Sequence, residues 1–419
     1  MNTSFATGLR CLRCDTRSPL GPSFEGCTAC ATDDFRSGLT PVYDYAALKE
    51  ALGDGPLEER GEGIWRYRRL LPVTAREHEL SLGEGHTPLL PMPRLASELG
   101  VAELWLKDEA RNPTLSFKDR NAAVTVGKAL DLGARTIVAS SSGNHGLAAA
   151  AYSARAGLPC VVVTYAGISP ALSLMIRGYG ARLGITTREG RWEIVGAGVR
   201  TRGWFPATNF TDIPTSSAYG HEGYKTIAYE LFDQLAGTVP DLVVVPVGNG
   251  EGLFGVWKGF SELALLGRTA STPRMLAAEP AGAPLAGVLA AHSAGGGLIG
   301  RVRSLTTVAR GIGGTVSSYM SLFTIQASDG LVAQVSDADV LTAQRDLAHE
   351  GIFAEPASAA ALAALRVAAG RGDLARAATI VLVNTSSGLK GLDSLVDSYD
   401  PPLTLSAADP ALELLSPAP

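Results

Sequence analysis

Long uncharged apolar runs and a surplus of charge of one sign are both missing from this sequence of 419 residues. No segment reaches the roughly 18 apolar residues that a membrane span requires. The first ten residues also lack the apolar core of a signal peptide. The net charge is −5, which argues against a surface that binds nucleic acid. We therefore expect a cytoplasmic protein that binds neither nucleic acid nor a membrane.

Aromatic residues are scarce at 6%, and charged residues reach only 18% of the chain. Glycine, in contrast, occurs 48 times, and hydrophobic residues make up 46%. A chain of this length can bury a large core in two ordinary domains. Because small residues allow helices to pack closely on sheets, this composition is typical of an α/β enzyme.

Cysteine is also rare, and four of the five cysteines form one pattern. Two residues separate Cys11 from Cys14, and after twelve more residues Cys27 and Cys30 repeat that spacing. Two such pairs bring four thiolates within reach of one tetrahedral Zn²⁺, which would be structural because no coordination site stays open. Two disulfides are the alternative, and a reducing compartment disfavours them. Cys160 lies in an apolar run and is expected to be an inert core thiol.

Strand and helix signals alternate along the chain. Short runs rich in Val, Ile and Leu predict buried strands, and the segments between them have the spacing and caps of helices. The predicted strands cover residues 136–139, 160–164, 241–247, 275–278 and 379–383, and the predicted helices cover residues 45–52, 146–156, 222–235 and 356–369. Near-continuous apolar strands joined by helices indicate parallel sheets that are covered on both faces.

Three polar loops follow predicted strands, where parallel sheets bind their ligands. Residues 140–145 precede a helix, so their backbone N–H groups could bind a carboxylate, although an ordinary helix cap is the alternative. Residues 248–252 (Gly-Asn-Gly-Glu-Gly) could surround a phosphate at a helix N-terminus, or simply form a tight turn. Residues 384–388 offer small hydroxyls that could meet a heteroaromatic nitrogen.

One lysine stands out upstream of these loops. Lys118 ends the run 112–118 (Asn-Pro-Thr-Leu-Ser-Phe-Lys), after a turn signal and at the expected start of a helix. A lysine held near backbone N–H groups and a helix dipole can have a lowered pKa and form a Schiff base with an aldehyde. Taken alone, the run is equally consistent with a surface lysine beside an Asp–Arg pair.

Pyridoxal phosphate requires a lysine that forms a Schiff base, a loop that binds its phosphate, a loop that binds the substrate carboxylate, and a partner for its ring nitrogen. Lys118 and the three polar loops could supply these groups. With them, the chain resembles the fold-type II pyridoxal-phosphate enzymes, and among these the threonine synthases. The resemblance rests on residues 82–89 (Leu-Gly-Glu-Gly-His-Thr-Pro-Leu), 112–120, 142–144, 248–252, and 355–360 together with 387–390. It implies an α/β fold in which two parallel-sheet domains hold the cofactor between them, and some members of the group also carry an N-terminal cysteine ribbon.

The resemblance implies a division of the chain as well. The zinc ribbon would occupy residues 1–36, and a small mobile domain would occupy residues 136–215. Residues 37–135 and 216–400 would form the large cofactor-binding domain, and residues 401–419 a loosely ordered tail. The resemblance also implies a homodimer.

Roles for individual residues follow from the resemblance. Lys118 should hold the cofactor aldehyde and move the protons at Cα and Cβ. The implied cofactor-binding residues are Lys118, Phe117, Asn144 at the ring 3′-oxygen, Gly248, Asn249, Gly250, Glu251 and Gly252 at the phosphate, and Thr385 at the pyridine nitrogen. The implied substrate-binding residues are Ser116, Ser141, Ser142, Gly143 and His145.

Two of these assignments carry further expectations. A hydroxyl such as that of Thr385 leaves the pyridine nitrogen largely unprotonated, which favours elimination and replacement over transamination. Because a carboxylate is a poor neighbour for a phosphate, Glu251 should point outward if residues 248–252 bind one.

Three positions depart from the threonine synthase pattern near the expected site. Leu115 and Asn121 stand where those enzymes usually have glycine, and His145 stands where they usually have threonine. His145 could serve as an acid or base, as a cation for an anionic substrate, or only as a cap of its own helix. His221 and Tyr219 are further pocket candidates.

A fourth departure concerns the arginine that the resemblance implies for the phosphate of the substrate. No arginine lies between Arg202 and Glu222, where it is expected. Asn209 and Ser216 could be remnants of such a site, but they lack the positive charge that a phosphate dianion requires.

The sequence therefore predicts a pyridoxal-phosphate lyase or synthase of the threonine synthase type. It would eliminate or replace a group at Cβ or Cγ of a small amino acid. One alternative is a threonine or serine dehydratase, or another β-replacing enzyme, whose substrate carries no phosphate or a different anion. The alternative of another class is a catalytically dead interaction protein with a zinc ribbon, which the intact Lys118 and glycine loop argue against.

Overall fold

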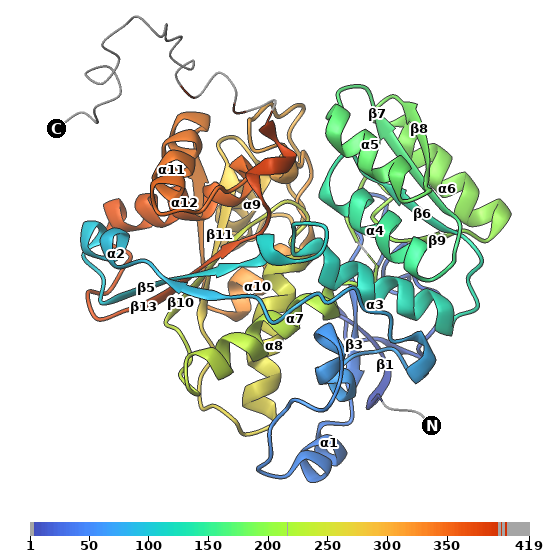
Figure 1. Ribbon diagram of the computed structural model, residues 1–419, viewed down its shortest axis with the longest axis horizontal. Helices are drawn as coiled ribbons and strands as arrows, with labels where there is room; N and C mark the ends of the chain where they lie inside the picture. Colours follow the sequence, from blue (N-terminus) through green and yellow to red (C-terminus); the bar gives the residue numbers. More distant parts are fainter. Residues whose placement is uncertain (1–3, 216, 393–394, 396–398, 400–419) are drawn as a thin grey trace, which may run out of the picture.

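Two parallel β-sheets form the body of the protein, and a small antiparallel sheet lies at the N-terminal end of the chain (Figure 1). The computed structural model describes residues 4–215, 217–392, 395 and 399. The predicted tail, residues 401–419, lies outside the described residues. The predicted α/β class with two parallel sheets is confirmed, whereas the domain boundaries and the mobility of the small domain stay predictions.

The larger sheet has six strands in the order β12-β11-β10-β13-β5-β4. All neighbours are parallel except β4, which runs antiparallel to β5 at the edge. Its strands are β4 Leu89–Pro91, β5 Glu103–Asp108, β10 Leu242–Pro246, β11 Arg274–Pro280, β12 Leu331–Val335 and β13 Thr379–Asn384. Val244 packs into the core on one face, and Val243 and Val245 pack into the core on the other. Burial on both faces explains why this strand has no polar alternation.

The smaller sheet has four parallel strands in the order β8-β7-β6-β9. They are β6 Ile137–Ser140, β7 Cys160–Tyr165, β8 Arg182–Thr186 and β9 Phe205–Pro206. Val162 packs on the side of α4 and α5, and Val163 packs on the side of α6. Cys160 is buried as expected, and burial raises the pKa of its thiol to about 11.

Helices cover the faces of both parallel sheets (Figure 1). Their bounds are α1 Tyr45–Leu52, α2 Pro93–Leu99, α3 Lys118–Asp131, α4 Asn144–Arg155, α5 Pro170–Gly178, α6 Gly190–Arg202, α7 His221–Gln234, α8 Glu251–Leu265, α9 Pro284–Ser293, α10 Tyr319–Ala327, α11 Asp337–His349 and α12 Pro356–Arg371. In the part of the chain that the structure describes, none is long and apolar enough to cross a membrane.

The predicted elements all form, and their ends shift by a few residues. The predicted helix 146–156 begins earlier, at Asn144, because Gly143 is the residue that leaves helical geometry. Strands β4, β5, β8 and β12 were not predicted: β4 has only three residues, β5 carries charged residues at both ends, and β8 and β12 are only partly buried.

The N-terminal sheet consists of β1 Ala6–Cys11, β2 Arg17–Ser18 and β3 Leu39–Tyr43, in the order β2-β1-β3. The segment between Cys11 and Cys30 contains β2, an edge strand of this sheet. Since β3 pairs with β1 along its length, this unit continues past residue 36.

Four buried charged side chains join β5, α3 and α7. Arg120 Nε lies 2.7 Å from Glu109 Oε2, and Arg120 Nη1 lies 2.7 Å from Glu230 Oε1. Lys107 Nζ lies 2.7 Å from the other oxygen of Glu230. The two helices meet so closely here that a Cβ on Gly223 of α7 would lie 2.0 Å from the carbonyl oxygen of Arg120. This ion cluster therefore fixes α3, whose first residue is Lys118, against the larger sheet.

Candidate active site

A cavity of about 310 Å³ opens where the carboxyl ends of strands from both parallel sheets face each other. From the smaller sheet it is lined by residues that follow β6, β7, β8 and β9, and from the larger sheet by residues that follow β10 and β13. Its size lies within the range of small-molecule sites. The predicted placement of the three polar loops at strand ends is confirmed.

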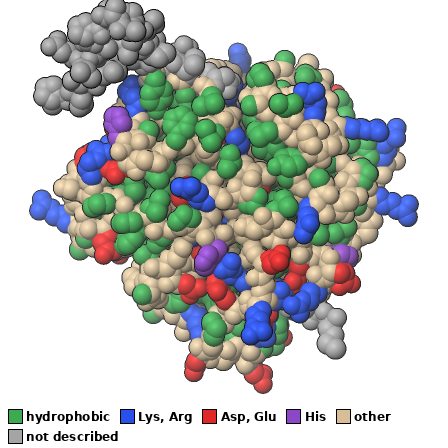
Figure 2. All heavy atoms as spheres, in the orientation of Figure 1, with side chains coloured by type: hydrophobic (Ala, Val, Ile, Leu, Met, Phe, Trp, Pro, Cys, Tyr) green, Lys and Arg blue, Asp and Glu red, His purple; other side chains and the backbone are tan. Residues whose placement is uncertain are grey.

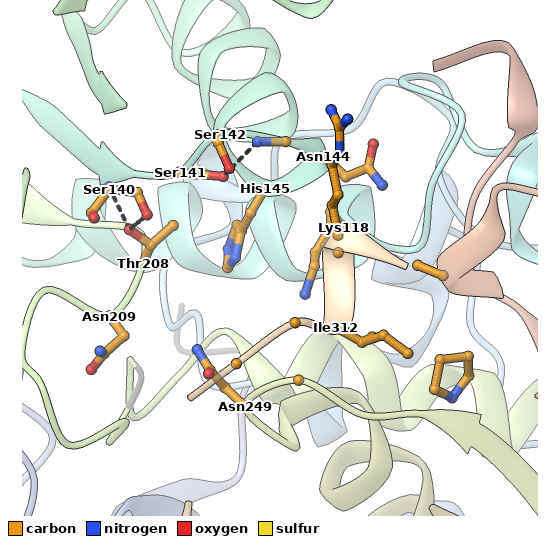
Figure 3. A pocket seen from close by; sticks show the side chains of 18 of the residues that line it. Lys118, Ser140, Ser141, Ser142, Asn144, His145, Thr208, Asn209, Asn249 and Ile312 are labelled. Atoms are coloured by element: carbon orange, nitrogen blue, oxygen red, sulfur yellow. Dashed lines mark hydrogen bonds between the residues drawn. The ribbon is translucent and has the colours of Figure 1, made fainter. Parts of the chain in front are cut away.

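Lys118 projects into this cavity from the first residue of α3. Its amine lies 4.7 Å from the centre of the Phe117 ring and 5.4 Å from that of Tyr224. Burial lowers the pKa of Lys118, and the carboxylate of Glu251 opposes this only in part. A lowered pKa raises the fraction of neutral, nucleophilic amine near neutral pH. Figure 3 shows Lys118 and His145 pointing into the same space, with Asn249 across from them.

The turn before Lys118 has an unusual backbone. Leu115 adopts a φ of 60°, in the left-handed region that favours glycine. Its carbonyl oxygen accepts hydrogen bonds from the backbone N–H of Ser387 and from Ser386 Oγ at the end of β13. The same geometry accounts for the glycine that threonine synthases have at this position. A leucine there costs about 1–2 kcal/mol, which the contacts to β13 must offset.

Residues 248–252 form a glycine cradle between β10 and α8. Gly250 has a φ of 82°, and a Cβ on it would lie 2.0 Å from Ser321 Oγ. A Cβ on Gly252 would lie 2.7 Å from Phe117 Cε2, and Ser318 Oγ donates a 2.7 Å hydrogen bond to the carbonyl of Asn249. Because no side chain caps the N-terminus of α8, its first N–H groups stay available for an anion.

Glu251 does not point outward, so that expectation was wrong. Only 6% of the residue is exposed, and its carboxylate acts on the charge of Lys118 across the cavity. Because Glu251 occupies the first turn of α8, its backbone N–H can serve an anion while its side chain faces the lysine. Only the backbone N–H of Glu251, and not its side chain, is therefore suited to contact an anion in the cradle.

Asn144 is the first residue of α4 and has one polar atom without a partner. Its Nδ2 donates to Glu355 Oε2 at 2.7 Å and to Ser386 Oγ at 3.1 Å. Its Oδ1 is buried and makes no hydrogen bond within the described residues. A buried acceptor without a donor is costly, and it is the kind of atom that a bound group would satisfy.

Thr385 also lines the cavity, just after the end of β13. Its hydroxyl is 2.8 Å from Ser358 Oγ in the first turn of α12, and its carbonyl accepts from the backbone N–H of Phe117 at 2.9 Å. Ser358 in turn accepts from the N–H of Ser386 at 2.8 Å. The end of β13, the start of α12 and the turn before α3 therefore hold one another in place.

Residues 140–145 bend from β6 into α4 around the rim of the cavity. Ser141 Oγ accepts from the N–H of Gly143 at 3.3 Å, and Ser142 Oγ donates to the Tyr165 hydroxyl at 3.2 Å. No side chain caps α4, so the alternative of an ordinary polar cap is not what forms. Ser141, Ser142, Gly143, Asn144 and His145 all line the cavity.

Two of the departures from the threonine synthase pattern contact each other. His145 Nε2 lies 3.0 Å from Asn121 Oδ1. Burial, and then the positive charge of Lys118, hold the pKa of His145 well below its usual value. A neutral imidazole therefore faces the cavity near neutral pH, which disfavours His145 as a cation. Its side chain bonds to α3, so it is not merely a cap of α4.

Asn121 also fills the space beside Gly220, within the segment where an arginine was expected. A Cβ on Gly220, two residues before Glu222, would lie 2.5 Å from Asn121 Nδ2 and 2.7 Å from Thr125 Oγ1. No larger side chain fits at this position while Asn121 is present. Asn121 therefore contacts His145 and also excludes a side chain at Gly220.

Three residues that the sequence pointed to take other places. Ser116 was expected at the substrate, but it is fully buried and does not line the cavity. His221 is buried against Thr40, and the Tyr219 hydroxyl bonds to the backbone of Gly21, so neither reaches the cavity. Asn209 does line it, with its amide engaged by Thr211 and the N–H of Thr215, whereas Ser216 lies outside the described residues.

Several lining residues escaped the sequence analysis. Arg188 reaches the cavity from the segment between β8 and α6, Arg191 from the first turn of α6, and Lys390 from beyond β13. Burial lowers the pKa of Lys390 to about 8. The rule about strand ends would have found the two arginines if the half-buried β8 had been recognised as a strand.

Comparison with known proteins decides the family. Residues 80–386 match the family described as "Pyridoxal-phosphate dependent enzyme". The chain belongs to the fold-type II pyridoxal-phosphate-dependent enzymes. It is 35% identical to a threonine synthase of Methanosarcina acetivorans over 95% of this chain and 96% of that one, and 33% identical to one of Methanocaldococcus jannaschii over 94% and 96%. The chain is therefore threonine synthase-like, a lyase that eliminates or replaces groups at the β or γ carbon.

The fold is also that of solved enzymes. An L-serine ammonia-lyase from Rhizomucor miehei superposes with a TM-score of 0.64 at 24% identity, over 75% of this chain and 99% of that one. Such a low identity shows the shared fold alone.

The residues of the cavity fit pyridoxal phosphate. The glycine cradle at the start of α8 suits a phosphate, the unpartnered Oδ1 of Asn144 suits a ring hydroxyl, and the Thr385 hydroxyl can meet the pyridine nitrogen. When bound, this cofactor supplies an electron sink for charge that develops at Cα. A catalytically dead protein is not supported, because the lysine and the cradle meet in one cavity.

The four N-terminal cysteines form a separate cluster. Their sulfur atoms all lie within 4.8 Å of one another. The Cys11–Cys30 and Cys14–Cys27 sulfur pairs are 3.6 and 3.7 Å apart. A tetrahedral zinc thiolate site requires about 3.8 Å between sulfurs, since each Zn–S bond is about 2.3 Å. A disulfide needs about 2.05 Å, so the geometry suits a metal and not two disulfides.

Gly252→Ala tests the cradle. The added methyl would push Phe117 toward Lys118, and such overpacking costs about 1–3 kcal/mol, which weakens cofactor binding about 5- to 150-fold. Titration of the apoenzyme with pyridoxal phosphate, followed by absorbance, measures the change. Gly287→Ala in α9 is the control, because its Cβ would meet nothing within 4 Å. An unchanged Kd in Gly252→Ala would count against the cradle.

Proposed function

We propose that Lys118 is the proton-transferring base of a threonine synthase-type reaction. In that reaction O-phosphohomoserine loses its phosphate from Cγ, water adds its hydroxyl at Cβ, and threonine and inorganic phosphate leave. The observation that carries the proposal is the meeting of the Lys118 amine, the glycine cradle and the 141–145 loop in one cavity. Similarity to curated threonine synthases over most of the chain supports the same reaction.

The chain's own residues would divide the work as follows. The N–H groups at the start of α4 bind the substrate carboxylate and so orient Cα. Lys118 holds the cofactor and, when freed from it, removes the Cα proton and carries protons to and from Cβ, as its lowered pKa allows. Thr385 offers a hydroxyl in place of a carboxylate to the pyridine nitrogen, which disfavours transamination.

His145 would position the reacting groups and not carry charge. Its hydrogen bond to Asn121 fixes the ring in place, and burial, followed by the charge of Lys118, lowers the pKa of His145 so that the ring stays neutral. A neutral ring leaves the lysine amine free of a second positive neighbour, which favours the deprotonated base.

A substrate screen of the holoenzyme tests the proposal. With O-phosphohomoserine we expect threonine and phosphate in equal amounts. L-serine and L-threonine report the dehydratase alternative, because they would yield a 2-oxo acid and ammonia. If no amino acid with a leaving group at Cβ or Cγ is converted, the proposed function is wrong.

Lys118→Ala is the matched control for that screen. We expect this variant to fold, because the helices and strands do not depend on the Lys118 side chain, and circular dichroism should match that of the wild type. It should nevertheless convert no substrate. Borohydride treatment followed by peptide mass spectrometry should attach the cofactor to Lys118 in the wild type alone. A cofactor attached to another lysine would assign the role elsewhere.

We further propose that Cys11, Cys14, Cys27 and Cys30 bind one structural zinc ion. Elemental analysis should give about one zinc per chain, and Cys11→Ser should lower both the zinc content and the melting temperature, because metal binding stabilises such folds. Cys160→Ser, away from the cluster, should leave the zinc content unchanged. Wild-type protein without zinc, or with disulfides in mass spectrometry, would contradict the assignment. The homodimer and the cytoplasmic location stay predictions.

A further inference from the structure

We propose that Arg188 and Arg191 form the binding site for a second anionic group of the substrate, one distinct from its α-carboxylate. The inference deepens the proposed function and rests on it. It defines the substrate class as amino acids that carry a phosphate or a second carboxylate away from Cα. The arginines take the part that the missing family arginine would otherwise play.

The two arginines lie on the same wall of the cavity. Arg188 comes from the segment that links β8 to α6, and Arg191 comes from the first turn of α6. Both face the ring of Tyr165, with guanidinium-to-centroid distances of 6.0 Å for Arg188 and 5.3 Å for Arg191. Arg191 also lies 5.0 Å from the ring centre of Trp192. Aromatic faces hold a guanidinium in a fixed plane without neutralising it. The pair is therefore oriented and still charged.

Neither arginine has an anionic partner in the described part of the chain. Arg188 Nη2 donates to the carbonyl of Gly313 at 3.1 Å, which holds it across the cavity from the larger sheet. Arg191 Nε is buried and makes no hydrogen bond there. Burial, together with the charge of Arg188, lowers the pKa of Arg191, and Glu189 opposes this shift without forming an ion pair with either arginine. A buried donor of this kind calls for an acceptor from outside the chain.

The acids that line the cavity are already engaged elsewhere. Asp212 pairs with Arg301 at 3.3 Å and is exposed. Glu355 accepts from Asn144 at 2.7 Å, and Glu251 faces Lys118. The positive charge of Arg188 and Arg191 therefore remains for a ligand, and low-dielectric walls increase its effect.

The order of groups along the wall fits a substrate with two anions. Ser142 of the carboxylate-binding loop contacts the hydroxyl of Tyr165, and the arginines lie against the ring of the same tyrosine. The two anion sites are thus adjacent but separate. Gly220, two residues before Glu222, has no room for a competing arginine, because Asn121 fills the space beside it.

Binding to the holoenzyme tests the inference without requiring turnover. The probes are inorganic phosphate, O-phosphohomoserine, O-phosphoserine and L-aspartate as anions, with L-serine and L-threonine as neutral counterparts. Calorimetry gives each Kd, and the absorbance of the cofactor reports the amino acids independently. The cofactor must be present, so that phosphate does not simply occupy the glycine cradle.

The variants are Arg188→Gln, Arg191→Gln and the double substitution. Each single change should weaken the anionic probes by about tenfold or more, since each removes charge-assisted hydrogen bonds, and should leave L-serine and L-threonine unchanged. Arg200→Gln is the control, because this residue lies on α6 with its side chain 62% exposed, away from the cavity. Thermal unfolding of every variant verifies that the fold is kept.

Three outcomes would overturn the inference. One is wild-type holoenzyme that binds none of the anionic probes, and another is a double variant that binds them as tightly as the wild type. The third is an equal loss for anionic and neutral amino acids. If phosphate binds through the arginines but no substrate is converted, the anion site stands and the proposed reaction fails, so the two failures are distinguishable. A difference in Kd between the phosphorylated probes and L-aspartate shows which anion the site prefers.

Discussion

The ion cluster buried beneath the start of α3 is the constraint on which the position of Lys118 depends. Arg120 bridges Glu109 and Glu230, and all three side chains are almost fully buried. Asp119 adds a second anchor, because its carboxylate accepts from the N–H and the hydroxyl of Thr114 at 2.9 and 2.8 Å. Moving charged groups out of water is costly unless they are paired with opposite charges. Because only one placement of α3 brings Arg120 to both glutamates, the ion cluster holds the helix in that position. Lys118 is thereby aimed into the cavity.

That anchoring joins the two halves of the site. α3 starts from the larger sheet, where the turn before it is bonded to the end of β13, and its side packs against α4 of the smaller sheet. Lys118 consequently stands between the glycine cradle of one sheet and the carboxylate loop of the other. The proposed chemistry needs this arrangement, since a base must reach Cα while the phosphate and the substrate carboxylate are held apart.

Much of this site was predictable because its signals are local. Strand-to-helix loops, the run that ends at Lys118 and the cysteine spacing each lie within a few residues of one another, and the strand-end rule places the loops together. The prediction that Glu251 points outward was wrong, because it considered only repulsion from a phosphate and not the attraction of Lys118 across the cavity. The prediction that Ser116 contacts the substrate was wrong, because Ser116 is buried by pairing with Ser386, which follows β13 far along the chain.

The substrate end of the site could not be predicted, because it depends on contacts between distant segments. Asn121 bonds to His145 and blocks space at Gly220, a relation that single positions do not reveal. Each departure alone weakens the resemblance to threonine synthases. Asn121 links two of them, since it contacts His145 and fills the space at Gly220, and Arg188 lines the same cavity.

The free energy of unfolding of Arg120→Met, from urea denaturation of the apoenzyme, tests this account most directly. The substitution leaves Glu109 and Glu230 buried with one partner fewer, so we predict a loss of about 3–5 kcal/mol together with weaker cofactor binding. Arg111→Met is the control, because that side chain is 67% exposed and its partner Asp108 keeps hydrogen bonds from Asn384 Nδ2 and the backbone N–H of Ala110. An Arg120→Met protein that unfolds like the wild type and binds the cofactor equally well would contradict the claim that the ion cluster positions Lys118.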